Sequence, residues 1–286
     1  MEKVALIGAN GQLAHDILRV FENYEVVGFT HAELDITDFN LLRERMSSLK
    51  PDVIINTAAY HRVDECEDYP EKSFLVNAVA VRELAKVSNE VGAVLVHFST
   101  DYVFGGDKDT PYTEEDAPMP LSVYGTSKLA GECFVRSIAR KFFLIRTCGL
   151  YGKAGSSGKG GNFVETMIKL ANAGKHIRVV SDQIVTPTYT YDLAVKVREL
   201  LETGSYGLYH ITSGGSCSWY EFAREIFGKL SMDADIEPIT SEEFGAKAKR
   251  PSYSVLDNEN LRRAGLSDMR DWRDALEDYL REKGYI

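Results

Sequence analysis

Short apolar runs alternate with longer helical patterns through the first half of this chain of 286 residues, and this alternation restricts the fold more than any other feature. Most positions in each run are apolar, as in strands that are buried on both faces of a parallel sheet. The runs lie at residues 4–7, 25–29, 53–56, 94–99 and 142–146. Strands that alternate with helices are joined by crossover connections, so we expect an α/β fold with a doubly wound parallel sheet.

A glycine-rich turn follows the first run and opens the first helical pattern. Its sequence is Gly8-Ala9-Asn10-Gly11-Gln12-Leu13-Ala14. Small residues permit a tight turn and let a pyrophosphate approach the backbone amides at the start of the helix. The turn therefore predicts a Rossmann-type dinucleotide site, and a plain strand-to-helix turn without a ligand is the alternative. The cofactor-binding residues expected here are Gly8, Asn10, Gly11, Gln12 and Leu13.

The end of the second run bears on the choice of cofactor. Gly28-Phe29-Thr30-His31 lacks the acidic residue that would bond a ribose 2′-hydroxyl and repel a 2′-phosphate. We therefore place Thr30 and His31 at the cofactor and expect NADPH to be accepted, with NADH as the second option. Asp35-Ile36 follows and could reach the adenine edge, and a turn aspartate that caps the next helix is an equal alternative.

The second half of the chain is organised differently. A stretch rich in glycine, serine and lysine at residues 152–161 predicts a flexible connection, and Asn162 with Glu165 predicts a capping box at the start of a helix. Beyond it we expect a strand at residues 208–211 and helices at 219–230 and 271–281, with Trp219 in the core of its helix.

These patterns divide the chain into two parts. We expect residues 1–149 to form an NAD(P)-binding Rossmann domain. Residues 150–286 are expected to form mainly a smaller α/β C-terminal substrate lobe, with some segments returning to the Rossmann domain.

A tyrosine and a lysine in Tyr124-Gly125-Thr126-Ser127-Lys128 are four residues apart and share one face if this segment is a helix. An ammonium beside a phenol favours the phenolate, so we expect Lys128 to lower the pKa of Tyr124 and allow proton exchange near neutral pH. The alternative is that Tyr124 and Lys128 are a pair on the surface of the helix without a catalytic role. The run at residues 94–99 continues into Thr100-Asp101, which places hydroxyl groups at the carboxyl edge of the sheet, where Ser99 or Thr100 can donate to a substrate carbonyl.

The phosphate turn, the hydroxyl-bearing strand end and the Tyr-x-x-x-Lys pair occur in the order found in extended short-chain dehydrogenases/reductases, and the chain resembles that family. Within it, the chain is similar along nearly its whole length to dTDP-4-dehydrorhamnose reductases. The residues that carry this resemblance are Gly11-Gln12-Leu13, Leu34-Asp35-Ile36, Asn56-Thr57-Ala58-Ala59, Val63-Asp64, Ser99-Thr100-Asp101-Tyr102-Val103-Phe104, Tyr124-Gly125, Lys128-Leu129-Ala130-Gly131-Glu132, Asp182-Gln183, Pro187-Thr188 and Arg250-Pro251.

The resemblance implies hydride transfer from NADPH or NADH to the C4 keto carbon of dTDP-4-dehydro-rhamnose, which would give dTDP-rhamnose. It implies that Tyr124, Lys128 and Thr100 are catalytic, with Tyr124 protonating the new alkoxide and Lys128 holding the nicotinamide ribose. It adds Ala58, Ala59, Tyr60, Tyr124 and Lys128 to the cofactor site. It assigns substrate binding to Thr100, Asp101, Tyr124, Gly149 and Arg250.

The chain departs from that pattern at Cys148-Gly149, where similar reductases usually have serine and then tryptophan. An aromatic contact to the sugar is missing there. Either another side chain fills the space, or the sugar differs from the usual one.

Charge and composition restrict the kinds of partner that the chain is expected to bind. A net charge of −10 argues against nucleic acid or an anionic membrane as the main partner, but it does not exclude a small phosphorylated ligand that local amides and cations hold. The four cysteines are scattered, the six histidines form no spaced ligand set, and we expect no metal site. Because the N-terminus lacks the pattern of a secretory signal, a soluble cytoplasmic protein is expected, with a homodimer as one option.

Two other functions fit the same residues. The first is a different nucleotide-sugar 4-keto reductase, epimerase or dehydratase, since these enzymes share the turn and the Tyr-x-x-x-Lys pair. The second is a non-catalytic partner, because the regulatory subunit of methionine adenosyltransferase resembles the same reductases. The Ser-Thr-Asp strand end favours reduction, and Tyr124 with Lys128 favours catalysis.

Overall fold

The computed structural model describes residues 2–155 and 161–286, and its centre is a parallel sheet of six strands in the order β10-β5-β4-β3-β1-β2. The strands are β1 (Lys3–Ile7), β2 (Glu25–Phe29), β3 (Val53–Asn56), β4 (Val94–Thr100), β5 (Phe142–Thr147) and β10 (Gly207–His210). The order reverses at β1, since β2 pairs with one side of it and β3 with the other. In such sheets a reversal marks the crevice in which ligands bind, and the glycine-rich turn begins there.

All five strands expected in the first half are confirmed, and they differ from the expected bounds by no more than one residue at either end. Burial explains their composition, because β3 and most of β4 and β5 are buried on both faces. The strand expected at residues 208–211 is also confirmed. It is β10, and it pairs in parallel with β5 at the edge of the main sheet.

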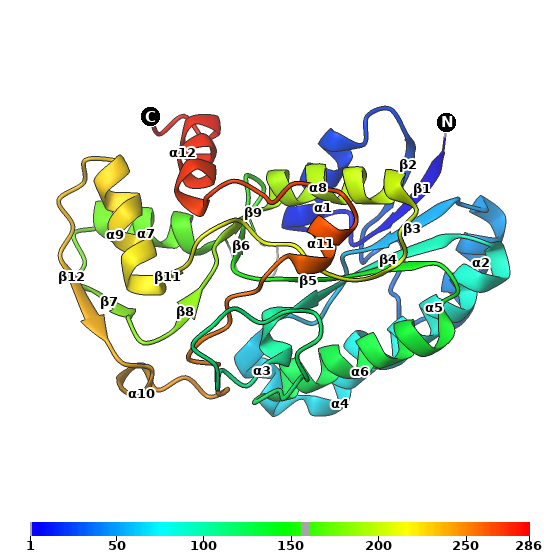
Figure 1. The fold of residues 1–286 in the computed structure, drawn as a ribbon, viewed down its shortest axis with the longest axis horizontal. Helices are drawn as coiled ribbons and strands as arrows, with labels where there is room; N and C mark the ends of the chain where they lie inside the picture. Colours follow the sequence, from blue (N-terminus) through cyan, green and yellow to red (C-terminus); the bar gives the residue numbers. More distant parts are fainter. Residues whose placement is uncertain (1, 156–160) are drawn as a thin grey trace.

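Helices cover both faces of the sheet, as expected for a doubly wound fold (Figure 1). One face carries α1 (Gln12–Val20) and α8 (Thr190–Thr203), and the other carries α2 (Phe39–Leu49), α5 (Ala80–Val91) and α6 (Val123–Ile138). Shorter helices complete this part, namely α3 (Val63–Asp68), α4 (Pro70–Phe74), η1 (Leu75–Val79), η2 (Asp101–Val103) and α11 (Glu259–Arg263). Each face has its own apolar core.

The C-terminal lobe lies at one end of the sheet (Figure 1). Its helices are α7 (Phe163–Asn172), α9 (Trp219–Lys229), α10 (Ser241–Phe244) and α12 (Trp272–Glu282). Its strands are β6 (Leu150–Tyr151), β7 (Ile177–Val180), β8 (Ile184–Val185), β9 (Thr188–Tyr189), β11 (Cys217–Ser218) and β12 (Ile236–Ile239). They form three two-stranded pairs, β6 with β9, β7 with β12, and β8 with β11. A third core, rich in aromatic side chains, fills the lobe.

One detail differs from the sequence predictions. Asn162 caps α7 by accepting from the backbone of Glu165, but the Glu165 carboxylate accepts from Tyr279 and Tyr285, so the cap is one-sided. Residues 156–160 of the expected flexible stretch lie outside the described residues. In the ranges that the structure does describe, no helix combines the length and apolar character that a membrane span requires.

Candidate active site

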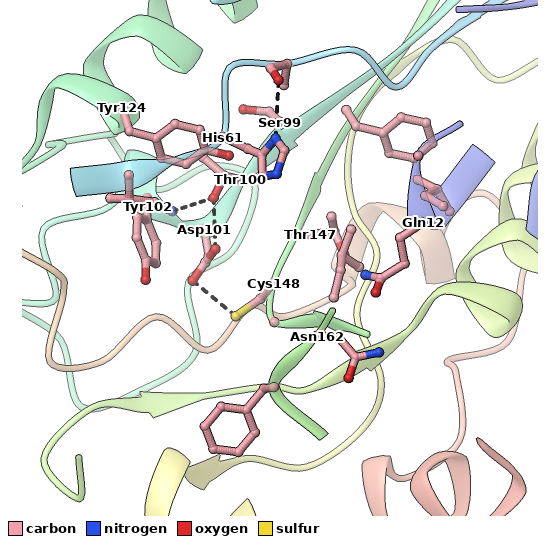
Figure 2. A pocket seen from close by; sticks show the side chains of 18 of the residues that line it. Gln12, His61, Ser99, Thr100, Asp101, Tyr102, Tyr124, Thr147, Cys148 and Asn162 are labelled. Carbon is pink, nitrogen blue, oxygen red and sulfur yellow. Dashed lines mark hydrogen bonds between the residues drawn. The ribbon is translucent and has the colours of Figure 1, made fainter. Parts of the chain in front are cut away.

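A cavity of about 510 Å³ lies at the carboxyl edge of the main sheet. Its walls come from the glycine-rich turn after β1, the ends of β4 and β5, helix α6, and the first residues of α7 and α9 in the lobe. Figure 2 shows Tyr124, Thr100 and Asp101 on one side of this cavity and Gln12 and Thr147 on the other. The cavity therefore joins the turn predicted to bind a cofactor to the residues predicted to be catalytic.

The turn after β1 has the geometry of a phosphate cradle. Gly8 has a φ of 83°, and a Cβ there would lie 2.8 Å from Thr57 Oγ1, so the position requires glycine. Gly11 precedes α1, and among the described residues no side chain caps this helix and no acidic residue lies in its first turn. The backbone amides at the start of α1 are thus available to an anion, and the helix dipole favours one there.

Two buried polar atoms in the same cavity have no hydrogen-bond partner among the described residues, namely Oε1 of Gln12 and Oγ1 of Thr147. A buried polar group without a partner costs about 1–3 kcal/mol, so such atoms mark places where a ligand can supply the missing bond. Together with the cradle at α1, these atoms fit a dinucleotide that lies across the ends of β1 and β5.

An acidic side chain, Glu33, lies beyond the end of β2 and turns back toward it. The Glu33 carboxylate folds back and accepts from the backbone N–H and the hydroxyl of Thr30, at 2.9 and 2.8 Å. These bonds lower the pKa of Glu33, so the side chain is ionised. Asp35 accepts from the backbone and hydroxyl of Thr37, and α2 is capped by Asp38 instead, which contradicts the predicted cap at Asp35.

Tyr124 and Lys128 lie on α6, as the spacing predicted, and both line the cavity. Ser122 caps the helix by accepting from the backbone N–H of Gly125. Gly125 also allows close packing, since a Cβ there would collide with the backbone carbonyl of Tyr102. Lys128 is 2 % exposed, and its Nζ donates to the backbone carbonyl of Phe98 at 2.6 Å.

The prediction that Lys128 lowers the pKa of Tyr124 is wrong. Burial and the Asp101 carboxylate raise the pKa of Tyr124 far above its ordinary value, and the hydrogen bond with Thr100 acts in the opposite direction. Burial lowers the pKa of Lys128 to about 8, whereas the Glu132 carboxylate raises it. Tyr124 is therefore a neutral phenol at pH 7, which suits a proton donor and not a base.

Asp101 is held in the cavity wall by three donors. The hydroxyl of Thr100 donates at 3.0 Å and the thiol of Cys148 at 3.1 Å (Figure 2). The hydroxyl of Ser254 donates at 2.6 Å. Burial raises the pKa of Asp101, and these hydrogen bonds lower it. The thiol thus takes part in fixing the carboxylate beside Thr100 and Tyr124.

Gly149 lines the cavity in a left-handed conformation, with a φ of 57°. A Cβ there would lie 3.0 Å from the carbonyl oxygen of Thr186 and 3.1 Å from Cα of Pro187, so an aromatic side chain would be strained. Aromatic surface comes instead from Phe163 and Trp219 in the lobe, which both line the cavity. Trp219 packs against the core of the lobe, as predicted, and its partly buried ring also lines the cavity.

A second cavity, of about 830 Å³, adjoins the first. Residues that line both cavities are Val63, Tyr102, Phe163, Thr166 and Trp219. The basic side chains that line the second cavity are Arg62, His176, Arg178 and Arg250. Arg250 donates to the Asp64 carboxylate at 2.9 Å and is hydrogen-bonded to the phenol of Tyr102, so its guanidinium stands near the boundary between the two cavities.

The structure brings some predicted residues together and separates others. Those that line the first cavity are Gly11, Gln12, Leu13, Ala59, Thr100, Asp101, Tyr124, Lys128 and Gly149. Those outside its lining are Gly8, Asn10, Thr30, His31, Asp35, Ile36, Ala58, Tyr60 and Arg250. Ile36 belongs to the core under α2, and the backbone and phenol of Tyr60 bond Asn77 and Glu65.

Several lining residues were not predicted to lie at the site, including Thr147, Asn162, Phe163, Thr166 and Trp219. Asn162 could be read only as a helix cap, and it does cap α7. The aromatic residues at the starts of α7 and α9 carried no signal that separates a core position from a cavity wall. An acidic run that begins at Asp64 lies on α3. Asp64 binds Arg250, and Glu67 accepts from the backbone of α6 at Val123.

The parallel sheet, the phosphate cradle and the Tyr-x-x-x-Lys pair in one cavity define a nicotinamide-dependent oxidoreductase of the short-chain dehydrogenase/reductase type. The family described as RmlD substrate binding domain matches residues 2–284. The chain belongs to this family, and the resemblance to dTDP-4-dehydrorhamnose reductases is confirmed.

Individual relatives support the same assignment. The chain is 42% identical over 285 residues to the spore coat polysaccharide biosynthesis protein SpsK of Bacillus subtilis, covering 99% of this chain and 98% of that protein. It is 37% identical to a dTDP-4-keto-6-deoxy-D-glucose reductase of Streptomyces niveus, covering 94% and 93% of the two chains. A solved structure of dTDP-4-dehydrorhamnose reductase from Bacillus anthracis in complex with NADP superposes with a TM-score of 0.94 and 42% identity, covering 98% and 99%.

Proposed function

We propose that this protein reduces the C4 keto group of dTDP-4-dehydro-rhamnose with hydride from NADPH, or from NADH, and gives dTDP-rhamnose. One observation carries the proposal. A neutral phenol on Tyr124, the hydroxyl of Thr100 and the buried ammonium of Lys128 line one cavity together with the uncapped start of α1. A hydride donor and a carbonyl can therefore meet within reach of a proton donor.

The cofactor supplies the hydride when it is bound. We assign Gly8, Gly11 and the start of α1 to its pyrophosphate, and Lys128 to its nicotinamide ribose. Tyr124 donates the proton to the oxygen that becomes an alkoxide, and its raised pKa keeps that proton in place until negative charge develops. Thr100 orients the same oxygen, and Asp101 fixes Thr100 through their hydrogen bond of 3.0 Å.

The second cavity is assigned to the nucleotide end of the substrate. It adjoins the reaction cavity, with which it shares five lining residues, so we assign one elongated ligand to both cavities. Its lining holds two carboxylates, Asp64 and Glu65, beside the basic side chains, and these carboxylates pair with Arg250 and Arg62. Guanidinium groups also pair well with phosphate oxygens, so a diphosphate can compete for them. Arg250 is the strongest candidate for the diphosphate, because it stands beside Tyr102 at the boundary.

Some expectations stay predictions. The division into a cofactor domain of residues 1–149 and a substrate lobe of residues 150–286 rests on topology, and α8 and β10 pack with the first part. A cytoplasmic location and a homodimer also stay predictions. A 4-keto-6-deoxy-glucose nucleotide is the second candidate substrate, because one relative is named for it and because no side chain of residue 149 restricts the sugar.

The test is to follow NADPH absorbance with dTDP-4-dehydro-rhamnose and with a panel of other 4-keto nucleotide sugars. We expect Tyr124→Phe to lower kcat by about 10²–10⁴ while NADPH still binds, because only the proton donor is removed. If the protein reduces only another 4-keto nucleotide sugar, the substrate assignment would be wrong, whereas the proposed mechanism would still hold. If NADPH binds but no keto sugar is turned over, the proposed reductase activity would be refuted and a role as a regulatory subunit would be favoured.

A further inference from the structure

A row of three buried polar side chains extends from Lys128 into the sheet. Asn56 at the end of β3, His97 on β4 and Lys128 on α6 are 1 %, 0 % and 2 % exposed. Asn56 and His97 are direct partners in the register of β3 and β4, so the sheet itself sets their contact. Nδ2 of Asn56 lies 3.1 Å from Nδ1 of His97, and Nε2 of His97 lies 3.5 Å from Nζ of Lys128.

The hydrogen bonds of Asn56 determine which nitrogen of His97 carries the proton. The backbone N–H of Ala58 donates to Oδ1 of Asn56 at 3.1 Å, so the oxygen of this amide must face Ala58 and its NH₂ group must face the imidazole. An NH₂ group can only donate, and Nδ1 of His97 is therefore an acceptor without a hydrogen. A neutral imidazole then carries its hydrogen on Nε2, directed at Lys128.

This tautomer is unfavourable for an ammonium at Lys128. An N–H group at Nε2 presents the positive end of its dipole to Nζ and offers no lone pair to accept from it. The imidazole also stays neutral, since burial and the charge of Lys128 hold the pKa of His97 well below its usual range. The ammonium is therefore left with the backbone carbonyl of Phe98 as its hydrogen-bond acceptor on β4.

Other charges near Lys128 come from the elements packed around α6. Glu132 on α6 favours the ammonium, but its carboxylate is bound by Arg146 of β5 at 2.6 Å and accepts from Ser99 of β4. Tyr124 on α6 faces Asp101 of η2 and Cys66 of α3, which act on the phenol. The Phe98 carbonyl can only favour the ammonium, whereas the neutral His97 imidazole can favour or disfavour it, depending on its tautomer.

We propose that His97, held by Asn56 in the tautomer with hydrogen on Nε2, is a positioning residue that limits the pH range in which Lys128 remains an ammonium. Through Lys128, it sets the alkaline limit of the reduction. This inference rests on the proposed function for its effect on turnover, whereas the tautomer and the titration of Lys128 do not depend on it.

The first experiment needs no substrate. In protein labelled with ¹⁵N at histidine, the His97 resonances are assigned by their loss in His97→Gln, and long-range ¹H–¹⁵N spectra are recorded between pH 6 and 10. We expect a protonated Nε2 and an unprotonated Nδ1, with a shift of both signals as Lys128 loses its proton at a pH of about 8. A hydrogen on Nδ1, or signals that do not change with pH, would overturn the proposal whether or not the protein is an enzyme.

The second experiment compares pH profiles of kcat/KM for the wild type, His97→Leu and His97→Gln. Leucine removes the N–H dipole and leaves the site apolar, whereas the glutamine carbonyl can turn to accept from Lys128. We expect the alkaline limb to move upward by about one unit in His97→Gln and by less in His97→Leu, so that at pH 9 His97→Gln keeps about five times more of its own maximum than the wild type.

His210→Gln is the matched control, since it removes another fully buried imidazole of the same sheet that makes no contact with Lys128. Its alkaline limb should coincide with that of the wild type. A limb at the wild-type position in a folded His97→Gln that binds NADPH would overturn the proposal while leaving the reductase assignment intact.

Discussion

The ring of Trp219 packs against the ring of Phe163, with their centroids 4.8 Å apart, and both rings line both cavities. The two residues start neighbouring helices of the lobe, α9 and α7. Gly149, which directly precedes β6, also lines the first cavity but offers no side chain to the sugar. The aromatic pair therefore offers a surface on which a sugar ring can stack where the two cavities adjoin.

Trp219→Leu is expected to weaken substrate binding more than it slows the chemical step. The substitution removes most of an aromatic face worth about 1–2 kcal/mol, which corresponds to a rise in KM for the keto sugar of roughly 5- to 30-fold. The value of kcat and the affinity for NADPH should change little. Tyr220→Leu, on the same helix but outside the lining of both cavities, is the control and should leave KM near the wild-type value.

Arg250→Gln is expected to weaken binding of the nucleotide end of the substrate. Loss of charge-assisted hydrogen bonds worth about 1.5–3 kcal/mol should lower the affinity for dTDP about 10- to 100-fold, measured by calorimetry. Arg263→Gln, an exposed arginine of α11 paired with Glu259, serves as the control. Equal affinities for dTDP in the wild type and Arg250→Gln would place the diphosphate elsewhere.

The sequence was sufficient for those parts of the site that depend on local geometry. A turn such as Gly8 to Gly11 needs small residues wherever it occurs, and a four-residue spacing puts Tyr124 and Lys128 on one face of any helix. Buried parallel strands have a continuous apolar composition, and the sheet followed from it. Each of these features depends only on residues that lie close together in the sequence.

Features that depend on how the lobe packs against the sheet, or on the register between strands, could not be predicted from the sequence. Trp219 has the same local sequence whether its ring enters the core or a cavity, and the placement of the lobe decides between them. The contact between Asn56 and His97 requires the alignment of β3 with β4, which the composition of two apolar strands does not specify. Glu33 lies beyond the end of β2 and reaches Thr30 only because the chain turns back there.

Glu33→Gln is expected to shift cofactor preference toward NADPH. The ionised carboxylate beside Thr30 disfavours a 2′-phosphate at the end of β2, and glutamine keeps the shape while removing the charge. The ratio of kcat/KM for NADPH over that for NADH should rise about three- to tenfold at low ionic strength and less at high salt, because the site is exposed. Glu22→Gln, another exposed carboxylate, should leave the ratio unchanged.

Stability should fall as the pH is lowered, because His210 is buried as a neutral imidazole. Burial and the Arg146 guanidinium lower its pKa to about 3, whereas the unfolded chain has the ordinary value near 6.5. Above about pH 6.5 the side chain adds no pH dependence. Below it, the unfolded state binds a proton that the folded state refuses, so stability is lost as the pH falls toward 3.

The loss from His210 alone amounts to about 2 kcal/mol in the free energy of unfolding between pH 7 and pH 5. His210→Gln cannot titrate, so the difference in stability between wild type and variant should shrink by about that amount over the same interval, measured by urea unfolding at both pH values. If the difference for His210→Gln were the same at both pH values, His210 would have to be charged in the folded protein at pH 5, and the hydrogen bonds of Arg146 on β5 would have to rearrange to accept a second cation beside it.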